Sequence, residues 1–596
     1  MNELLRVEGL GVAYGAASAV ADVSFELGAG RCLGVIGESG AGKSQAFLAL
    51  MDLLPAQARV SGKASLAGQP LLGDARALRG RQVAMIFQDP LSALTPHMTI
   101  GDQVAEPLVV HRGLSWQDAR ARAARLLDQV RVSDVPRRLG QYPHELSGGM
   151  RQRAMIAMAL ACDPQLLIAD EPTTALDVSV QAQLLKLLRE LVAERRMALA
   201  LVTHDMGVIA ALADDVLVMR GGRVVERGAV HGILSQPAHE YTRSLLAASP
   251  RLDDVPPMPV KAAPGERGTA PPLEVRDVVV RFGLRRHWWS RAEALVAVDG
   301  VSFELADGEA LGIVGESGSG KSTLTRALLR LGPQAQGQVS WLGNRLLELD
   351  GAELRALRAS MQIVFQDPFA SLDPTLSVAE CIAEPLRALR PEMDAAARAA
   401  AVSRALESVG LDAGYASRRS PTLSGGQCQR VAIARAMVLG PKLLVCDEAV
   451  SALDVSIQAQ VLELLARIKR ERGTSLVFVS HNLAVVRRLC ERVLVMYLGR
   501  VVESGPTEHV FTAPRHPYTR MLLESVPRLD PSQERARLAA LGAAGDTPSP
   551  VDRPTGCAFR TRCPAAMPRC AADRPEPESV DQAHQVACLR WRELTN

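Results

Sequence analysis

Two kinds of apolar pattern alternate along the chain. Short continuous apolar runs, such as RCLGVIG (31–37), LLIAD (166–170) and LALVTH (199–204), have the length and composition of fully buried strands. Longer apolar segments with the spacing of helices lie between them, such as FLALMDLL after the first of these strands. Strands that alternate with helices predict an α/β fold with a mostly parallel sheet, in which ligands bind at the carboxyl ends of the strands.

The same pattern occurs twice. GVIGESGAGKS (34–44) returns as GIVGESGSGKS (312–322), and later landmarks return at nearly the same offset, including LSGG, the acidic strand ends and GRVVE. This register indicates a tandem duplication. We therefore expect a first domain at 1–250, an extended linker rich in proline and glycine at 251–272, a second domain at 273–528, and a C-terminal extension at 529–596 that has no counterpart in the first copy.

Composition limits the choice of function. The chain has 596 residues, of which 47% are hydrophobic and 22% charged, which is ordinary for a soluble globular protein. A net charge of +3 gives no support to nucleic-acid binding. We find no signal peptide and no apolar run long enough to span a bilayer, so we expect a cytoplasmic protein with reduced thiols. Six scattered cysteines are expected to be core residues: Cys32, Cys162, Cys381, Cys428, Cys446 and Cys490.

Each copy carries a phosphate-binding loop. GESGAGKS and GESGSGKS both fit G-x-x-x-x-G-K-[ST] between a strand and a helix, where backbone N–H groups can cradle phosphate oxygens. Lys43 and Lys321 would reach the β- and γ-phosphates of ATP, and Ser44 and Ser322 would bind Mg²⁺. The remaining expected ATP contacts are Gly37, Ser39, Gly40, Gly42 and Gln45 in the first copy, and Gly315, Ser317, Gly318, Gly320 and Thr323 in the second.

Acidic residues close a buried strand in each copy. Asp170 and Asp447 end the strands LLIAD and LLVCD, where a Mg²⁺-organising carboxylate is expected. Glu171 and Glu448 follow directly, and they are the best candidates to polarise the attacking water. The fixed distance of these acids from a phosphate-binding loop in both copies strengthens the assignment.

LSGGM (146–150) and LSGGQ (423–427) each precede an apolar helix that bears arginine and glutamine. In a single copy, an ordinary serine N-cap would explain such a motif. Here the motif resembles the signature of the ATP-binding cassette (ABC) proteins. The resemblance implies two tandem ABC-type P-loop ATPase domains, each with a mostly parallel sheet and a helical subdomain, and a small cysteine-containing tail. The expected signature contacts with ATP are Ser147, Gly148, Gly149, Ser424, Gly425, Gly426 and Gln427.

The resemblance also assigns further roles. It implies that the two cassettes pair within the chain, so that Lys43 and Ser424 share one ATP while Lys321 and Ser147 share the other. Gln88 and Gln366 would contact Mg²⁺ and sense a membrane partner, His204 and His481 would contact the γ-phosphate, and Tyr14 and Phe282 would stack on adenine. TALD (174–177) and SALD (451–454) match the D-loop. Met150 and Ala449 depart from the usual residues without removing a charged catalytic group, so both sites are expected to be active.

Three further stretches, FQDPLSALTP, HPYTRMLL and GCAFRTRCP, resemble the oligopeptide/dipeptide/nickel importer family. That family implies two separate transmembrane permease subunits, an extracytoplasmic binding protein, and a peripheral position at the cytoplasmic face of the inner membrane. Peptides are the favoured substrate class, and nickel chelates, glutathione and peptide antibiotics remain alternatives. Tandem ABC ATPases outside transport are disfavoured, because the linker is short and the even offset leaves little room for an insertion.

Four cysteines lie together in the tail: Cys557, Cys563, Cys570 and Cys588, spaced C-x5-C-x6-C-x17-C. This spacing fits neither common zinc modules nor the ferredoxin motif, although four thiolates satisfy the ligand count of zinc or of an iron–sulfur cluster. Relatives with a [4Fe–4S] cluster favour that interpretation, with zinc and simple packing of thiols as alternatives. The tail has few large apolar residues to offset the entropy of ordering it, so metal bonds would help to fold it. Its role would be structural or regulatory.

Overall fold

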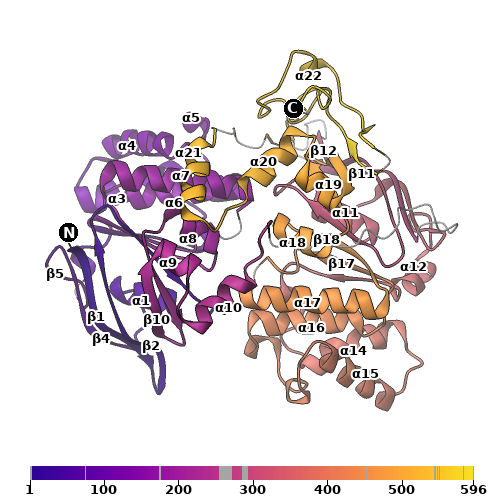
Figure 1. Cartoon of the computed structure of the whole chain (residues 1–596), viewed down its shortest axis with the longest axis horizontal. Coiled ribbons are helices and arrows are strands. Elements are labelled where there is room, and N and C mark those ends of the chain that lie inside the picture. The colour runs from indigo at the N-terminus through magenta and orange to yellow at the C-terminus, as the bar shows by residue number, and fades with distance from the viewer. Residues whose placement is uncertain are drawn as a thin grey trace. The chain divides into compact units, whose positions relative to one another are not determined.

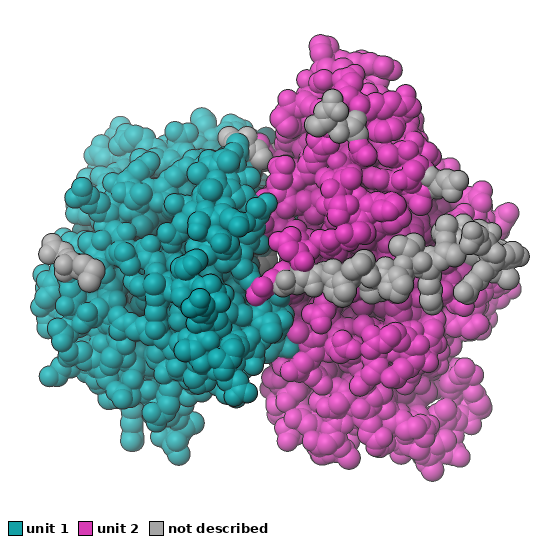
Figure 2. Space-filling view, in the orientation of Figure 1, with its two compact units in different colours: residues 1–249, 454–456, 527–544 teal, residues 250–453, 457–526, 545–596 magenta. Residues whose placement is uncertain are grey.

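A computed structural model describes residues 3–594 of the chain, except 74, 174–175, 254–271, 285–292, 452, 543–544, 546–547, 550 and 582. Contacts divide the chain into two compact units (Figure 2). The first unit comprises residues 1–249, 454–456 and 527–544, and the second comprises 250–453, 457–526 and 545–596. In the described part of the chain, no helix is long and apolar enough to cross a membrane. Most of the expected linker, 251–272, lies outside the described residues.

The core of the first unit is a six-stranded sheet in the order β10-β9-β3-β8-β7-β6. All neighbouring pairs are parallel except β10 with β9, which confirms the predicted mostly parallel sheet. β3, β7 and β8 are buried along their whole length, as their continuous apolar sequences predict. The strands are β3 (Cys32–Ile36), β6 (Val83–Ile86), β7 (Leu166–Asp170), β8 (Ala198–Val202), β9 (Asp215–Arg220) and β10 (Arg223–Ala229).

A second, antiparallel sheet of the first unit has the order β2-β1-β4-β5. Its strands are β1 (Glu3–Tyr14), β2 (Ala17–Gly28), β4 (Ala58–Leu66) and β5 (Gln69–Pro70). Side-chain caps at Thr99 and Ser115 start the two long helices α3 and α4, which pack on each other and on α6. The helices are α1 (Lys43–Leu50), α2 (Pro90–Ala93), α3 (Ile100–Arg112), α4 (Trp116–Gln129), α5 (Val135–Arg138), α6 (Gly148–Leu160), α7 (Val178–Arg195), α8 (Met206–Leu212), α9 (Val230–Ser235) and α10 (Glu240–Ala248).

The second unit repeats this plan. Its antiparallel sheet has the order β12-β11-β14-β15, with β11 (Leu273–Leu284), β12 (Glu293–Leu305), β14 (Ala335–Trp341) and β15 (Asn344–Arg345). The core strands are β13 (Ala310–Val314), β16 (Met361–Val364), β17 (Leu443–Asp447), β18 (Ser475–Val479), β19 (Arg492–Tyr497) and β20 (Arg500–Pro506). The helices are α11 (Lys321–Leu328), α12 (Gly351–Arg358), α13 (Pro368–Ser371), α14 (Val378–Leu389), α15 (Ala395–Ser408), α16 (Gly425–Met437), α17 (Val455–Arg472), α18 (Leu483–Leu489), α19 (Thr507–Thr512) and α20 (Pro517–Ser525).

The tail joins the second unit. Two short strands, β21 (Glu578–Ser579) and β22 (Gln585–Val586), extend the core sheet beyond β20 and make it eight-stranded. A short helix, α22 (Arg569–Ala572), precedes these strands in the sequence. His584 lies 2.8 Å from the buried carboxylate of Glu503 in β20. Phe559 is buried and packs on the rings of Tyr497 and Tyr518. Contacts with the second cassette therefore supply stabilisation that the apolar residues of the tail could not provide by themselves.

One helix of the C-terminal extension, α21 (Pro531–Ala540), belongs instead to the first unit. It contacts α7 and α8, so a golden helix lies beside purple ones in Figure 1. Leu538 is buried in the core of the first unit, and Lys186 of α7 donates a hydrogen bond of 2.5 Å to the carbonyl of Leu541. The chain thus leaves the second unit after 526 and returns to it at 545.

Candidate ATP sites

In both units the phosphate-binding loop connects a buried strand to a helix, β3 to α1 and β13 to α11. The last glycine before the lysine, Gly42 or Gly320, is the N-cap of the helix and has a φ of 90° or 100°. A Cβ on Gly42 would lie 2.3 Å from the carbonyl oxygen of Ala19, and one on Gly320 equally close to that of Ala297. Only glycine fits this backbone, which turns the loop sharply into the helix.

The loop lysines are buried and face their own loops. Lys43 donates to the carbonyls of Gly37 at 2.7 Å and Glu38 at 2.8 Å. Lys321 makes the equivalent bonds to the second loop at 2.8 and 3.0 Å. Burial lowers the pKa of Lys43, and the nearby carboxylates, Glu171 foremost, oppose this effect. Each ammonium group is thus held inside a curl of backbone that is suited to phosphate oxygens.

The serine that follows each lysine is bonded to the acid at the end of a strand. Ser44 lies 2.9 Å from Asp170, and Ser322 lies 2.8 Å from Asp447. Burial raises the pKa of both carboxyls, and the serine hydrogen bonds oppose that rise. A hydroxyl and a carboxylate brought together in this way are oxygen ligands of the kind that Mg²⁺ prefers, so the residues present fit this ion.

The glutamate after each acid has a strained backbone. Glu171 and Glu448 have φ values of 49° and 50°, in the left-handed region that residues with a side chain rarely adopt. Their N–H groups still bond to the neighbouring strand, to Val202 at 2.8 Å and to Val479 at 3.1 Å. Strain of this kind persists only where the surrounding structure imposes it, and it is common at functional sites. No sequence pattern announced it.

Glutamine and histidine complete each site. Gln88 donates to Glu171 at 2.7 Å, and Gln366 donates to Glu448 at 2.8 Å. The Nδ1 atom of His204 lies 3.1 Å from Glu171, while that of His481 is 3.7 Å from Glu448. Every predicted pair of catalytic side chains therefore meets within its own copy.

Electrostatic coupling within these pairs changes their pKa values. Burial disfavours the charged form of His204, but the hydrogen bond and the charge of Glu171 outweigh it and raise the pKa of His204. Burial likewise disfavours the ionised form of Glu448, but His481 and Lys321 outweigh it and lower the pKa of Glu448. The second glutamate is thus kept ionised, as a group that attracts a proton from water must be.

The signature serines are the N-caps of α6 and α16. Ser147 accepts a hydrogen bond from the backbone of Met150, and Ser424 accepts one from Gln427. In the second unit the side-chain oxygen of Gln427 accepts a hydrogen bond of 3.0 Å from the backbone N–H of Ser424, which completes a capping box. Met150 cannot make that bond. A Cβ on Gly148 would meet nothing within 4 Å, so its face is open.

The aromatic candidates differ between the copies. The hydroxyl of Tyr14 donates a hydrogen bond of 2.6 Å to Gln45, directly after the first phosphate-binding loop. Phe282 is 36% exposed on β11. Parts of the expected D-loops, Thr174, Ala175 and Ala452, lie outside the described residues.

Two family models match the chain. The model "ABC transporter" matches residues 20–174 and 298–451, which contain the geometry described above in both copies. The chain therefore belongs to the family of ABC transporter ATP-binding proteins and is an ATPase, for which ATP and Mg²⁺ are the expected ligands. The model "Oligopeptide/dipeptide transporter, C-terminal region" matches 225–270 and 502–570, which places the chain among the importers of that type.

The similar proteins extend this result over nearly the whole length. The chain is 47% identical to the "Glutathione import ATP-binding protein GsiA" of Escherichia coli K12 and to that of Shigella sonnei, over 92% of this chain and 93% of each relative. The protein of the same name from Salmonella typhimurium is 46% identical over 93% of this chain and 94% of the relative.

Proposed function

We propose that this protein hydrolyses ATP to drive the import of short peptides, with the tripeptide glutathione as the first substrate to test. The observation that supports this proposal is the complete set of lysine, serine, aspartate, glutamate, glutamine and histidine in both copies. The serine–aspartate and glutamine–glutamate bonds have nearly equal lengths in the two copies. The identity to glutathione import proteins over 92% of the chain favours glutathione over nickel chelates and peptide antibiotics.

We assign the roles as follows. In each copy the loop lysine holds the β- and γ-phosphates of ATP. The Mg²⁺ ion would be held by Ser44 and Asp170 in the first copy, and by Ser322 and Asp447 in the second. Mg²⁺ would neutralise charge on the phosphate oxygens. The glutamine amide nitrogen is engaged by the glutamate, which leaves its oxygen as a further ligand. Glu171 or Glu448 orients and polarises the water, and the histidine holds the γ-phosphate.

The pairing of Lys43 with Ser424 and of Lys321 with Ser147 stays a prediction. The open face beside Gly148 supports the pairing of Lys321 with Ser147, because a signature glycine that meets no neighbour of its own leaves room for phosphate. A Cβ on Gly425, in the other signature, would meet Phe369 at 3.9 Å, which is ordinary contact. The stacking of Tyr14 and Phe282 on adenine is likewise a proposal. A nucleotide analogue that crosslinks from its adenine ring should label Tyr14, and labelling that never includes it would contradict the assignment.

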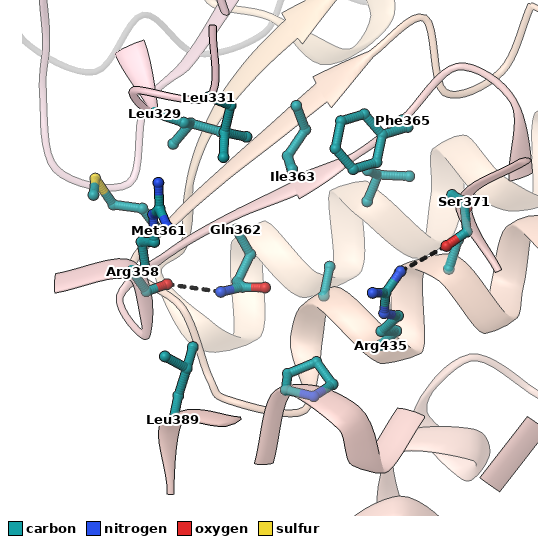
Figure 3. Close-up of a pocket in the computed structure, with 14 residues that line it drawn as sticks. Leu329, Leu331, Arg358, Met361, Gln362, Ile363, Phe365, Ser371, Leu389 and Arg435 are labelled. Carbon is teal, nitrogen blue, oxygen red and sulfur yellow. Dashed lines mark hydrogen bonds between the residues drawn. The ribbon is translucent and has the colours of Figure 1, made fainter. Parts of the chain in front are cut away.

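We propose that two permease subunits dock on equivalent surfaces of the two cassettes. In the second copy, a cavity of about 240 Å³ lies between β16, α14 and α16 and is lined by apolar side chains such as Leu331, Ile363 and Phe365 (Figure 3). Phe365 directly precedes Gln366, so an occupant would adjoin the residue that contacts the catalytic glutamate. Leu331 and Phe369 are exposed near this cavity, and the duplicate positions, Leu53 and Leu91, are exposed in the first copy.

The experiment that tests this function uses the full chain with its permeases. Proteoliposomes that contain both permeases and external binding protein should accumulate labelled glutathione only with ATP on the side of the cassettes. Leu331→Asp should weaken permease binding in a pull-down and leave the ATPase activity of the isolated chain unchanged, because Leu331 is exposed and lines the cavity rather than the ATP site. Unchanged pull-down with both Leu53→Asp and Leu331→Asp would refute the docking surface. Binding to the two permease subunits would place this protein peripherally at the cytoplasmic face of the inner membrane.

We further propose that the tail cysteines bind a [4Fe–4S] cluster. Cys557, Cys563, Cys570 and Cys588 all line one cavity of about 20 Å³. Within the described residues, no group of three or more cysteine, histidine or acidic side chains is already arranged to hold a metal ion, so the thiols would have to move together. Burial raises the pKa of Cys588 to about 11, so binding must also displace protons.

The colour and metal content of anaerobically purified protein test this cofactor. A cluster predicts brown protein, broad absorption near about 400 nm and about four irons per chain, as expected for four thiolate ligands. Colourless protein with one zinc would select the alternative. Metal-free protein whose tail resists protease would refute both, and would leave packing against the second unit as the source of its order.

A further inference from the structure

The tail reaches the second phosphate-binding loop directly. Arg562, the residue before Cys563, forms two hydrogen bonds with the carboxylate of Glu316, the second residue of the loop GESGSGKS. The distances are 2.5 Å from Nη1 to Oε2 and 2.9 Å from Nη2 to Oε1. The side chains are only 2% and 1% exposed. Two parallel bonds between arginine and a carboxylate fix both position and orientation.

Two aromatic rings lie beside this pair. The guanidinium of Arg562 lies 5.9 Å from the ring centre of Tyr497 and 5.8 Å from that of Phe559. Burial alone would lower the pKa of Arg562, but the bonds to Glu316 and its charge raise it above its usual value. Removal of either partner would leave a charge in the interior without its counter-charge, which is strongly unfavourable.

Glu316 also contacts the groups that bind ATP. Its backbone N–H donates to the hydroxyl of Tyr518 at 2.8 Å, and its carbonyl accepts from the ammonium group of Lys321 at 3.0 Å. The side chain of Glu316 therefore bonds to the tail, and its backbone carbonyl bonds to the ATP-binding lysine. A shift of Glu316 would move the acceptor of Lys321.

The first phosphate-binding loop has different surroundings. Glu38 makes the equivalent backbone bonds, to Tyr241 at 3.0 Å and with Lys43 at 2.8 Å, but its side chain is only half-buried. The arginine beside this tyrosine, Arg220, comes from β9 and lies 4.9 Å from the ring centre. The tail has no counterpart after the first copy, so among the described residues this clamp by a segment that follows the cassette is found at the second loop.

We propose that the C-terminal tail is part of the second ATP site, with Arg562 as a positioning residue that fixes the phosphate-binding loop through Glu316. This inference rests on the binding of ATP by the second loop. Because Cys563 is the next residue, any change that unfolds the cysteine cluster also releases this loop. The tail then controls ATP binding at the second cassette and leaves the first unaffected.

The test measures the affinity of each cassette separately in the full-length chain. Lys43→Ala leaves the second loop as the reporter, and Lys321→Ala leaves the first. In isothermal titration with MgATP, Arg562→Met should raise the Kd about tenfold in the Lys43→Ala chain, which is within the usual range of coupling between sites. It should leave the Kd of the Lys321→Ala chain unchanged. Arg569→Met is the matched control, because Arg569 is exposed in the same tail and pairs with Asp573.

A second set of variants separates positioning from folding. Glu316→Gln should raise the Kd of the second site as Arg562→Met does, and the double variant should lose less than the sum, since no charge is then left without a partner. The turnover number at saturating ATP should stay nearly constant, because Glu448 is untouched. Arg562→Lys should restore part of the affinity.

Several results would overturn the inference: an equal loss in both cassettes, a loss as large in Arg569→Met, or unchanged affinity in both Arg562→Met and Glu316→Gln. If Arg562→Met fails to fold, Glu316→Gln decides. If the Lys43→Ala chain with an intact tail binds no ATP at all, the assignment of the second ATP site fails together with this inference.

Discussion

Replacement of the two strained glutamates should stop hydrolysis and leave ATP binding intact. The carboxylate oxygens of Glu171 lie 2.7 Å from Gln88 and 3.1 Å from His204. A glutamine side chain in place of Glu171 has nearly the same size and reach. Glu171→Gln therefore keeps the packing but removes the charge that attracts a proton from water. Loss of a general base slows a reaction by about 10²–10⁴-fold. We expect a fall of at least about 10²-fold in the Glu171→Gln/Glu448→Gln double variant.

Phosphate release at saturating MgATP measures this effect, and titration with ATP confirms that the nucleotide still binds. Glu194→Gln, at an exposed position near the end of α7, is the matched control and should turn over normally. Each single variant should be impaired, because in both sites the glutamate bonds to the glutamine and faces the histidine. If Glu171→Gln hydrolysed ATP at the normal rate while Glu448→Gln were inactive, the first site would be degenerate. A double variant that kept more than about a tenth of the activity would refute the role of these glutamates as general bases.

Three further predictions concern stability. The pKa of His204 is raised in the folded protein, so its contribution to stability should be complete below about pH 6.5 and lost as the pH rises through the folded pKa. In urea unfolding, Glu171→Gln should therefore lose more stability relative to the unmodified protein at pH 6 than at pH 8.5. An equal loss at both pH values would contradict the coupling. Gly42→Ala should destabilise the first unit by about 1–3 kcal/mol and weaken ATP binding, while Gly232→Ala, whose Cβ meets nothing within 4 Å, should do neither in thermal unfolding. Leu538→Ala should destabilise the first unit by about 2–5 kcal/mol, although the residue follows the second cassette; a melting shift confined to the second unit would contradict its placement.

Local patterns predicted the parts of the fold and the sites that depend on neighbours in sequence. The buried strands, the loops that follow them and the acids at strand ends are each set by a few adjacent residues, and parallel pairing then brings their carboxyl ends together. This is why Ser44, at the start of α1 after β3, could be assigned to one site with Asp170 and Glu171, at the end of β7.

The parts that were not predicted depend on tertiary contacts. Arg562 and Glu316 are 246 residues apart, and nothing in either local sequence indicates that they meet. The helix α21 has few large apolar residues, and its position is set by Leu538 entering a core formed by distant helices. The left-handed backbone of Glu171 and Glu448 follows from the strands around it, because the sequence there contains no glycine to signal it.

The position of α21 limits how the two halves can be made separately. A fragment that ends near residue 250 would expose to water the apolar surface of α7 and α8 that Leu538 covers, so it should be prone to aggregate. A fragment of the second half would in turn carry an unpaired helix that fits this surface. Coexpressed halves should therefore recognise each other through residues 527–544, and protease that cuts the linker between the cassettes should leave them bound together. The helix that follows the second cassette completes the first.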